Sequence, residues 1–130
     1  MDTDETGRRG EQAAARYYLR HGYTLLAHNF RQRVGEIDLI LRDPEGVIVF
    51  CEVKTRTDPD SLCRPADSVT RAKRRRLIRT AVLYLQQTEQ SDAFARFDVA
   101  EVIPLDSGRW MVHIIKSAFD SSDGKLRTDL

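Results

Sequence analysis

The fold of this chain is decided by a hairpin of two mostly apolar strands around a turn. Residues 35–56 read GEIDLILRDPEGVIVFCEVKTR. The turn signal is Asp-Pro-Glu-Gly at residues 43–46, and a three-residue loop with Gly46 in the left-handed conformation is a common hairpin connection. This loop fixes the register of the two strands, which places Asp38 opposite Glu52.

The register determines which residues lie on each face of the hairpin, because side chains alternate between the faces along a strand. One face is expected to be apolar and consists of Ile37, Leu39, Leu41, Val49, Cys51 and Val53. The other face mixes charged and apolar residues and consists of Glu36, Asp38, Ile40, Ile48, Phe50, Glu52, Lys54 and Arg56. The apolar members of this second face indicate that another element covers part of it. A two-residue loop would instead send one of the two facing carboxylates into the core, at a cost in free energy.

Two carboxylates that face each other across adjacent strands repel, so Asp38 and Glu52 need a cation or a proton between them. A hard divalent ion such as Mg²⁺ (or Mn²⁺) fits, since it takes carboxylate oxygens and keeps open positions for water or phosphate. Lys54 lies two residues beyond Glu52 on the same face. Its ammonium group could stabilise charge on a phosphate, or help orient or deprotonate an attacking water. The alternative is a solvent-exposed face with an ion pair between Glu36 and Lys54.

A helix is expected before the hairpin, over residues 7–21, and it adds a third carboxylate. It contains three consecutive alanines, and Gly22 is well placed as its C-terminal stop. Glu11 lies on the side expected to face the sheet, together with Ala14, Ala15, Tyr18 and Leu19. This carboxylate could complete a metal shell or hold a metal-bound water. Alternatively, it only interacts favourably with the helix macrodipole.

The rest of the chain reads as strands and one further helix. Strands are expected over 23–30, 35–42, 47–56, 96–103 and 110–115. The second helix is expected from about 70 to 87, and its apolar stripe consists of Leu77, Ile78, Ala81, Val82 and Leu85. The order of helix, three strands, helix and two strands predicts helices packed on a mixed sheet. We expect one domain over residues 1–120 and a polar C-terminal tail over 121–130.

The second helix opens with a run of cations, which is unfavourable at the N-terminal end of a helix dipole. A phosphate backbone would compensate, through the side chains and the free N–H groups of the first turn. The candidate nucleic-acid-binding residues are Lys73, Arg74, Arg75 and Arg76. Either Lys73, at the edge of the apolar stripe, or Arg74, which continues it, could lean toward the carboxylates. A solvated basic face is the alternative.

The overall composition hides this segregation of charge. The chain has 130 residues, 41% hydrophobic and 32% charged, and its net charge of +1 by itself argues against a highly basic protein that coats nucleic acid. Segments 1–35, 36–67, 68–88 and 89–130 carry charges of +2, −4, +6 and −3. An acidic block suited to a cation therefore precedes a basic block suited to a polyanion.

Several classes of protein are excluded at this level. No apolar run approaches the roughly 20 residues that span a bilayer, and the N-terminus is acidic, so we expect a cytoplasmic protein without membrane contact. The two cysteines, Cys51 and Cys63, do not form a disulfide framework, and zinc-ligand spacings are missing. Asp98 is expected to pair with a basic residue.

Asp38 followed by Glu52-Val53-Lys54 resembles the D…(D/E)xK signature of the PD-(D/E)xK nuclease superfamily. A larger part of the chain, about residues 7–103, resembles the YraN-type family of small bacterial proteins within it. The matching positions are Gly10-Glu11, residues 35–40, residues 49–56, Lys73 and residues 96–99. The chain departs from the family pattern at Cys51, where an aliphatic residue is common, and in the connector at 62–65.

This resemblance implies a single restriction-endonuclease-like domain of the α/β (α+β) class, with an αβββαβ core and helices flanking a mixed sheet, similar to Holliday-junction resolvases. It implies that Asp38 and Glu52 bind the metal, that Lys54 is catalytic and that Glu11 assists. The expected function is a Mg²⁺-dependent endonuclease that hydrolyses phosphodiester bonds in DNA, with branched DNA as a candidate substrate. The alternative is a nucleic-acid-binding module or adaptor without turnover. Resolvases act as symmetric pairs, so a homodimer is a further expectation.

Overall fold

The computed structural model describes residues 3–56 and 69–119 of the chain. Within these ranges the helices are α1 (Thr3–Arg20) and α2 (Arg71–Gln87), and the strands are β1 (Thr24–Gln32), β2 (Gly35–Arg42), β3 (Ile48–Thr55), β4 (Ala95–Pro104) and β5 (Trp110–Phe119). This order confirms the predicted α+β class and the predicted αβββαβ core. The predicted tail at 121–130, the connector at 62–65 and Cys63 lie outside the described residues.

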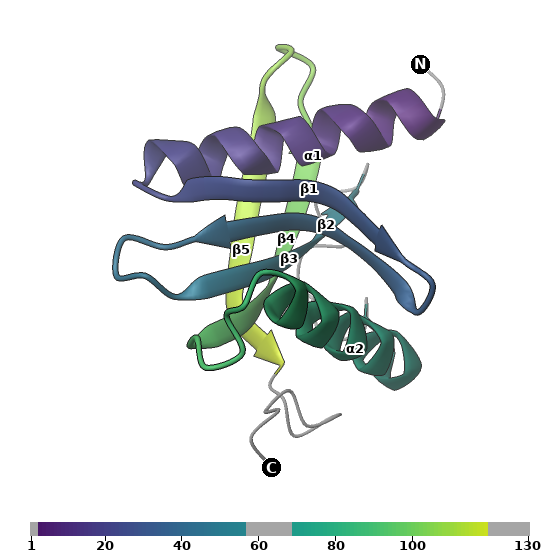
Figure 1. Cartoon of the computed structure of the whole chain (residues 1–130). Helices are drawn as coiled ribbons and strands as arrows, with labels where there is room; N and C mark the ends of the chain where they lie inside the picture. Colours follow the sequence, from purple (N-terminus) through teal and green to yellow (C-terminus); the bar gives the residue numbers. More distant parts are fainter. Residues whose placement is uncertain (1–2, 57–68, 120–130) are drawn as a thin grey trace.

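The strands form one mixed sheet in the order β1-β2-β3-β4-β5. Neighbouring strands pair antiparallel except β3 and β4, which are parallel. A parallel pair needs a crossover connection, and α2 lies in the segment that joins these two strands. Figure 1 shows the sheet between the two helices, with α1 above it and α2 below.

The hairpin of β2 and β3 has the predicted register. Leu39 pairs with Cys51 and Arg42 pairs with Ile48, as the three-residue loop requires. Gly46 has a φ of +95°, in the left-handed region that favours glycine. The turn chemistry therefore sets the alignment of the two carboxylate-bearing strands.

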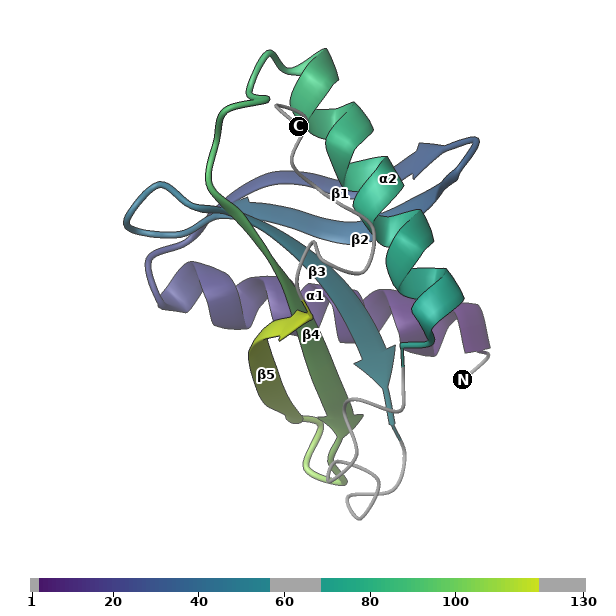
Figure 2. The ribbon, with the colours of Figure 1, turned by 90° about the horizontal axis from the view of Figure 1, so that it is seen from below.

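Two hydrophobic clusters fill the two faces of the sheet. The cluster on the α1 side includes Ala14, Tyr18, Leu39, Leu41, Val49 and Cys51. The cluster on the α2 side includes Ile40, Ile48, Phe50, Leu77, Ile78 and Ala81. Figure 2 shows α2 lying over the sheet beside β2. The second helix is thus the element that covers the apolar part of the charged hairpin face, as predicted.

Two residues differ from the expected faces. Ile37 packs in the α2-side cluster instead of beside Leu39. The regular alternation of β2 is interrupted at Asp38, which bonds to the next strand through its side chain. Leu19 is 48% exposed because the buried side of α1 is centred on Ala14 and Tyr18, and Leu19 lies beyond its edge.

The first helix starts about one turn earlier than expected, at Thr3, and ends as predicted before Gly22. Gly22 has a φ of +86°, and the Tyr23 N–H donates to the Tyr18 carbonyl at 3.1 Å. These features form a Schellman motif, which satisfies carbonyls at the helix end and turns the chain into β1.

Candidate active site

The predicted carboxylates lie where β2 and β3 separate, at the open end of their hairpin. The ladder between the two strands extends to Leu39 and Cys51. Next to that pair, Asp38 Oδ2 accepts a hydrogen bond from the Val53 N–H at 2.8 Å. A side chain here bonds to the backbone of the neighbouring strand, which fixes the carboxylate of Asp38 at the point of separation.

Glu52 is held by two lysines from different elements. Its side chain is only 8% exposed, and Oε1 lies 2.7 Å from Lys73 Nζ and 3.4 Å from Lys54 Nζ. Lys54 is on β3 itself, whereas Lys73 is in the first turn of α2. The Thr70 side chain caps that turn by accepting from the Lys73 N–H at 3.2 Å, which positions the residue. The packing of α2 on the sheet therefore assembles this buried cluster.

Burial raises the pKa of Asp38 to about 7, and the charge of Glu52 adds to the rise. The hydrogen bond from Val53 opposes the rise in pKa, while Glu11 and Glu36 have smaller effects in the same direction as Glu52. A carboxyl group in this state gains from a nearby cation, which would favour its ionised form. Perturbed acids of this kind are common at functional sites.

The two lysines differ in their electrostatics. Burial lowers the pKa of Lys54, and Lys73 lowers it further, although Glu52 opposes both effects. Burial alone would also lower the pKa of Lys73, but its hydrogen bond and ion pair with Glu52 outweigh burial and raise that pKa. Lys54 is therefore the lysine from which a proton is more easily removed.

Glu11 approaches the site from α1. A Cβ atom at Gly10 would overlap the side chain of Thr55, so glycine is what lets α1 pack this closely on the sheet. Burial raises the pKa of Glu11, and Glu36 adds to the rise, whereas a hydrogen bond from Asn29 opposes it. Glu11 thus lies in a half-buried position within the field of the other acids.

The three predicted carboxylates are not assembled into a metal-binding group. Within residues 3–56 and 69–119, no set of three or more His, Cys, Asp or Glu side chains lies close enough together to hold a metal ion. Asp38 and Glu52 alone still offer the hard oxygen donors that suit Mg²⁺, with water filling the other positions. Their chemistry fits the ion, while ligation by Glu11 stays a prediction.

The basic residues of α2 point in different directions. Lys73 turns inward to Glu52, whereas the guanidinium of Arg74 lies over the ring of Phe119, 5.6 Å from its centroid. Arg75 and Arg76 are exposed. Of the two candidates for leaning toward the carboxylates, the structure selects Lys73.

The alternative of a simple ion pair between Glu36 and Lys54 is wrong. Glu36 Oε2 lies 3.2 Å from Nε of Arg31, its register partner on β1. Lys54 is turned to Glu52 instead. The charged hairpin face is therefore organised around Glu52.

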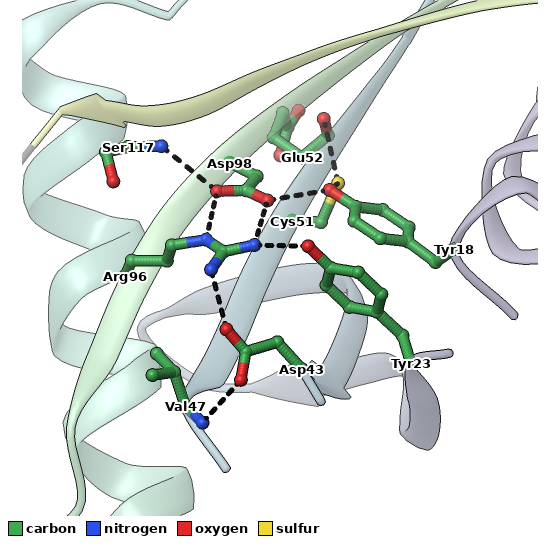
Figure 3. A network of polar contacts seen from close by, with 9 residues as sticks. All are labelled: Tyr18, Tyr23, Asp43, Val47, Cys51, Glu52, Arg96, Asp98 and Ser117. Carbon is green, nitrogen blue, oxygen red and sulfur yellow. Dashed lines mark hydrogen bonds and ion pairs between the residues drawn. The ribbon is translucent and has the colours of Figure 1, made fainter. Parts of the chain in front are cut away.

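Asp98 belongs to a buried network, drawn in Figure 3, that connects through Tyr18 and Cys51 to the backbone carbonyl of Glu52. It is fully buried and accepts hydrogen bonds from Tyr18 Oη at 2.9 Å, Arg96 Nε at 3.1 Å and Ser117 N at 3.1 Å. Arg96 also donates to Asp43 at 2.9 Å, in the turn of the hairpin. This confirms the predicted pairing of Asp98 with a basic residue. Asp98 thus connects α1, β4 and β5. No pattern in the sequence predicted its contact with Tyr18.

The fold and the site define a class: an α+β protein with a buried carboxylate and lysine cluster at the end of a hairpin. The family described as "Uncharacterised protein family UPF0102" matches residues 10–102. The chain belongs to this family, the YraN family, which confirms the predicted resemblance. A UPF0102 protein of Symbiobacterium thermophilum is 48% identical over 113 residues, which cover 87% of this chain and 94% of the relative. One of Desulfosudis oleivorans is 43% identical over 116 residues, covering 89% and 90%.

Two solved structures are distantly similar. The "Structure of EndoMS-dsDNA2 complex" has a TM-score of 0.36 and 17% identity, covering 68% of this chain and 34% of that chain. Pyrococcus furiosus SfsA in complex with Ca²⁺ has a TM-score of 0.41 and 14% identity, covering 86% and 63%. These similarities are too weak to bear on function, so the description of the fold rests on the topology above. No helix in the described part of the chain is long and apolar enough to cross a membrane.

Proposed function

We propose that this protein is a metal-dependent endonuclease that hydrolyses phosphodiester bonds in DNA. The observation that supports this most is the placement of Asp38 and Glu52 on separating strands, with Lys54 turned to the second carboxylate. Asp38 and Glu52 would hold Mg²⁺ or Mn²⁺, and Glu11, whose pKa is raised by burial and in part by the charge of Glu52, would assist from α1. The cation, when bound, supplies Lewis-acid stabilisation of the phosphate and a more acidic water.

The residues of the chain carry the remaining roles in this proposal. The lowered pKa of Lys54 suits a group that orients the attacking water or takes its proton. Lys73 holds Glu52 in position and presents a second ammonium group to the phosphate side of the site. The ammonium group of Lys73 places a positive charge where negative charge develops during hydrolysis, and Lys54 does the same when it is protonated.

The substrate class is proposed from the surface beside the site. Arg75 and Arg76 are exposed on α2, two and three residues beyond Lys73, and their side chains can contact a phosphate backbone. Branched DNA of the Holliday-junction type is the proposed structure, acted on by a homodimer, since two-fold substrates suit symmetric pairs. We place the catalytic domain at residues 1–120 and its location in the cytoplasm.

The test is cleavage by matched preparations. Wild-type protein, Glu52→Ala and Lys54→Ala are each incubated with single-stranded, duplex and four-way-junction DNA in Mg²⁺ or Mn²⁺. We expect cleavage by wild type, abolished by EDTA and reduced by about 100-fold or more in both variants. An Arg42→Ala variant, changed at an exposed residue at the far end of the hairpin, should cleave like wild type. Equal cleavage by all four proteins would identify a contaminating nuclease and contradict the assignment.

A binding module without turnover is the second candidate. The ion pairs of Glu52 with Lys73 and Lys54 favour it, because they neutralise the carboxylate without a cation. Salt-sensitive DNA binding with no cleavage in either metal would support this alternative. If the protein neither binds nor cleaves DNA, an adaptor in a protein complex becomes the better explanation.

A further inference from the structure

A large polar cavity lies on the other side of α1 from the candidate active site. It is a groove open to solvent between α1 and the turn between β4 and β5, which projects past the helix in Figure 1, and the arginines that line the groove are exposed. Its volume is about 820 Å³, within the range of cavities that bind small molecules or cofactors. We call it the arginine pocket, after the side chains that characterise it: Arg9, Arg16, Arg20, Arg109, Tyr17 and Trp110.

The helix places three of these arginines in one row. Positions 9, 16 and 20 are seven and four residues apart, which puts their side chains on the same face of α1. Glu11 lies roughly 160° around the helix from Arg9, so the arginine pocket and the candidate active site occupy opposite flanks of α1. The fourth arginine, Arg109, comes from the β4–β5 turn. Two elements distant in sequence therefore converge on one cationic cavity.

The charge of the arginine pocket is one-sided. Among the described residues that line it, four are arginines and none is acidic. Arg9 pairs with Glu5 at 3.0 Å on the exposed rim, a contact of the kind that contributes little stability in water. A cavity that gathers guanidinium groups in this way raises the local concentration of anions. Arginine is also the residue best shaped to bind phosphate with two parallel hydrogen bonds.

Aromatic rings identify which anion fits. Tyr17 and Trp110 are half-buried and line the same cavity as the arginines. A free phosphate uses no aromatic surface, whereas a nucleotide presents a phosphate and a base that stacks on aromatic rings. We infer that the arginine pocket binds a single-stranded segment of nucleic acid, with its phosphates on the arginines and a base against Trp110. This inference takes nucleic acid as the ligand class from the proposed function and adds a second contact to it.

Tryptophan fluorescence tests the pocket directly, because Trp110 is the single tryptophan of the chain. A short single-stranded oligonucleotide is titrated in EDTA, so that binding is measured without cleavage. We expect saturable quenching of Trp110, with affinity about tenfold or more weaker in the double variant Arg16→Glu/Arg109→Glu. The slope of log affinity against log salt should fall by about 0.7 for each arginine removed. The variant Arg42→Glu, charged oppositely at an exposed site outside the pocket, should bind like wild type.

A charge-preserving variant guards against a folding defect. Arg16→Lys/Arg109→Lys should retain affinity within about threefold, because it keeps the charges and loses only the bidentate geometry. Far-ultraviolet circular dichroism verifies that each variant keeps the secondary structure of wild type. Loss of quenching in the Glu variant together with retention in the Lys variant would assign the effect to charge in the pocket.

Three results would overturn the inference. Binding detected by anisotropy of a labelled oligonucleotide with constant Trp110 emission would place the strand elsewhere. If inorganic phosphate quenches Trp110 as much as the oligonucleotide does at the same phosphate concentration, the pocket binds anions in general and does not recognise a nucleotide base. If neither anisotropy nor Trp110 fluorescence detects oligonucleotide binding, the arginine pocket is not a nucleic-acid site.

The experiments can reject the endonuclease function and the arginine pocket independently of each other. Cleavage of DNA in Mg²⁺ with no response of Trp110 would leave the proposed function standing and reject the arginine pocket. A Trp110 response without cleavage would support the pocket and reject the endonuclease assignment.

Discussion

At Asp38 a side chain takes the place of a backbone contact between two strands. The β2–β3 ladder ends at Leu39 and Cys51, and Asp38 Oδ2 then accepts the hydrogen bond from Val53 N. The carboxyl group is held in a half-buried position where burial, followed by the charge of Glu52, raises its pKa to about 7. An acid placed in this way ionises at a cost, which a shared cation would offset.

The raised pKa of Asp38 predicts how the stability of the protein in EDTA depends on pH. The folded protein keeps this proton up to about pH 7, whereas the ordinary value is 3.8. The contribution to stability is therefore complete below pH 3.8 and is lost as the pH rises through 7. The neutral variant Asp38→Asn should raise the free energy of unfolding by about 2 kcal/mol at pH 8 and by only about 0.5 kcal/mol at about pH 4.5.

Urea unfolding at the two pH values checks this prediction. Asp92→Asn, at an exposed loop residue, is the matched control and should have no effect at either pH. Added Mg²⁺ should stabilise wild type at pH 8 and stabilise Asp38→Asn less, since a ligand that binds the folded state raises its stability. An equal effect of Asp38→Asn at both pH values would contradict the assigned cause.

At the scale of elements, the close packing of α1 on the sheet depends on Gly10. Alanine in place of a helical glycine usually stabilises by about 0.5 to 1 kcal/mol. At Gly10, however, a Cβ would overlap Thr55 Oγ1 and lie 3.0 Å from Val102 Cγ2. Gly10→Ala should therefore destabilise the protein by about 1 to 3 kcal/mol, as overpacking does.

The same helix provides the control for Gly10. A Cβ at Gly7 would have no atom within 4 Å, so Gly7→Ala should show the ordinary stabilising effect in urea unfolding. Adding Thr55→Ala to Gly10→Ala should recover part of the loss, because it removes the overlapping oxygen. Gly10→Ala as stabilising as Gly7→Ala would show that α1 has room to move away from the sheet.

The elements also show what sequence could and could not predict. The hairpin and its register as far as Leu39 and Cys51 followed from the turn at 43–46, because local chemistry fixes them. The predicted alignment of Asp38 with Glu52 lies beyond the end of this ladder. The sequence left open whether Lys73 or Arg74 reaches the carboxylates, since the contact of Lys73 with Glu52 depends on how α2 packs over the sheet. The face of Ile37 was predicted wrongly for the same reason, as a tertiary contact overrode the regular alternation.

Sequence patterns also missed the full length of some strands. β5 runs to Phe119 rather than to residue 115, although Lys116 and Ser117 interrupt its apolar pattern. Ser117 has a φ of +51° and donates its N–H to Asp98, and Phe119 then packs against Phe97 in the α2-side cluster. The end of this strand is held by long-range contacts, which a local pattern cannot reveal.

At the scale of the whole molecule, the small net charge of +1 results from the cancellation of segregated regions. The carboxylates gather between β2 and β3, the first basic group lies at the start of α2, and four arginines line the cavity beyond α1. If both proposals hold, a nucleic-acid strand would meet cations on two sides of one acidic site. Polyanion binding would then follow from the arrangement of charge rather than from its sum.

The network around Asp98 joins the elements on which these regions lie. It links Tyr18 of α1, Arg96 of β4, Ser117 of β5 and, through Arg96, Asp43 in the hairpin turn. Asp98→Ala would leave the guanidinium of Arg96 partly buried without this partner, and removing one member of a buried pair is strongly destabilising. We expect a loss of about 3 kcal/mol in the free energy of unfolding, measured in urea.

A matched exposed pair separates this effect from a general loss of charge. Glu5 and Arg9 lie at 3.0 Å, almost the 3.1 Å of Asp98 and Arg96, but on the surface of α1. Glu5→Ala should cost only about 0.5 kcal/mol, because exposed pairs are screened by water. The double variant Asp98→Ala/Arg96→Ala should lose less than the sum of the two single variants, since the pair is coupled. Additive losses, or a cost for Asp98→Ala no larger than that of Glu5→Ala, would mean that the network does not join the sheet, the hairpin turn and α1 into one cooperative structure.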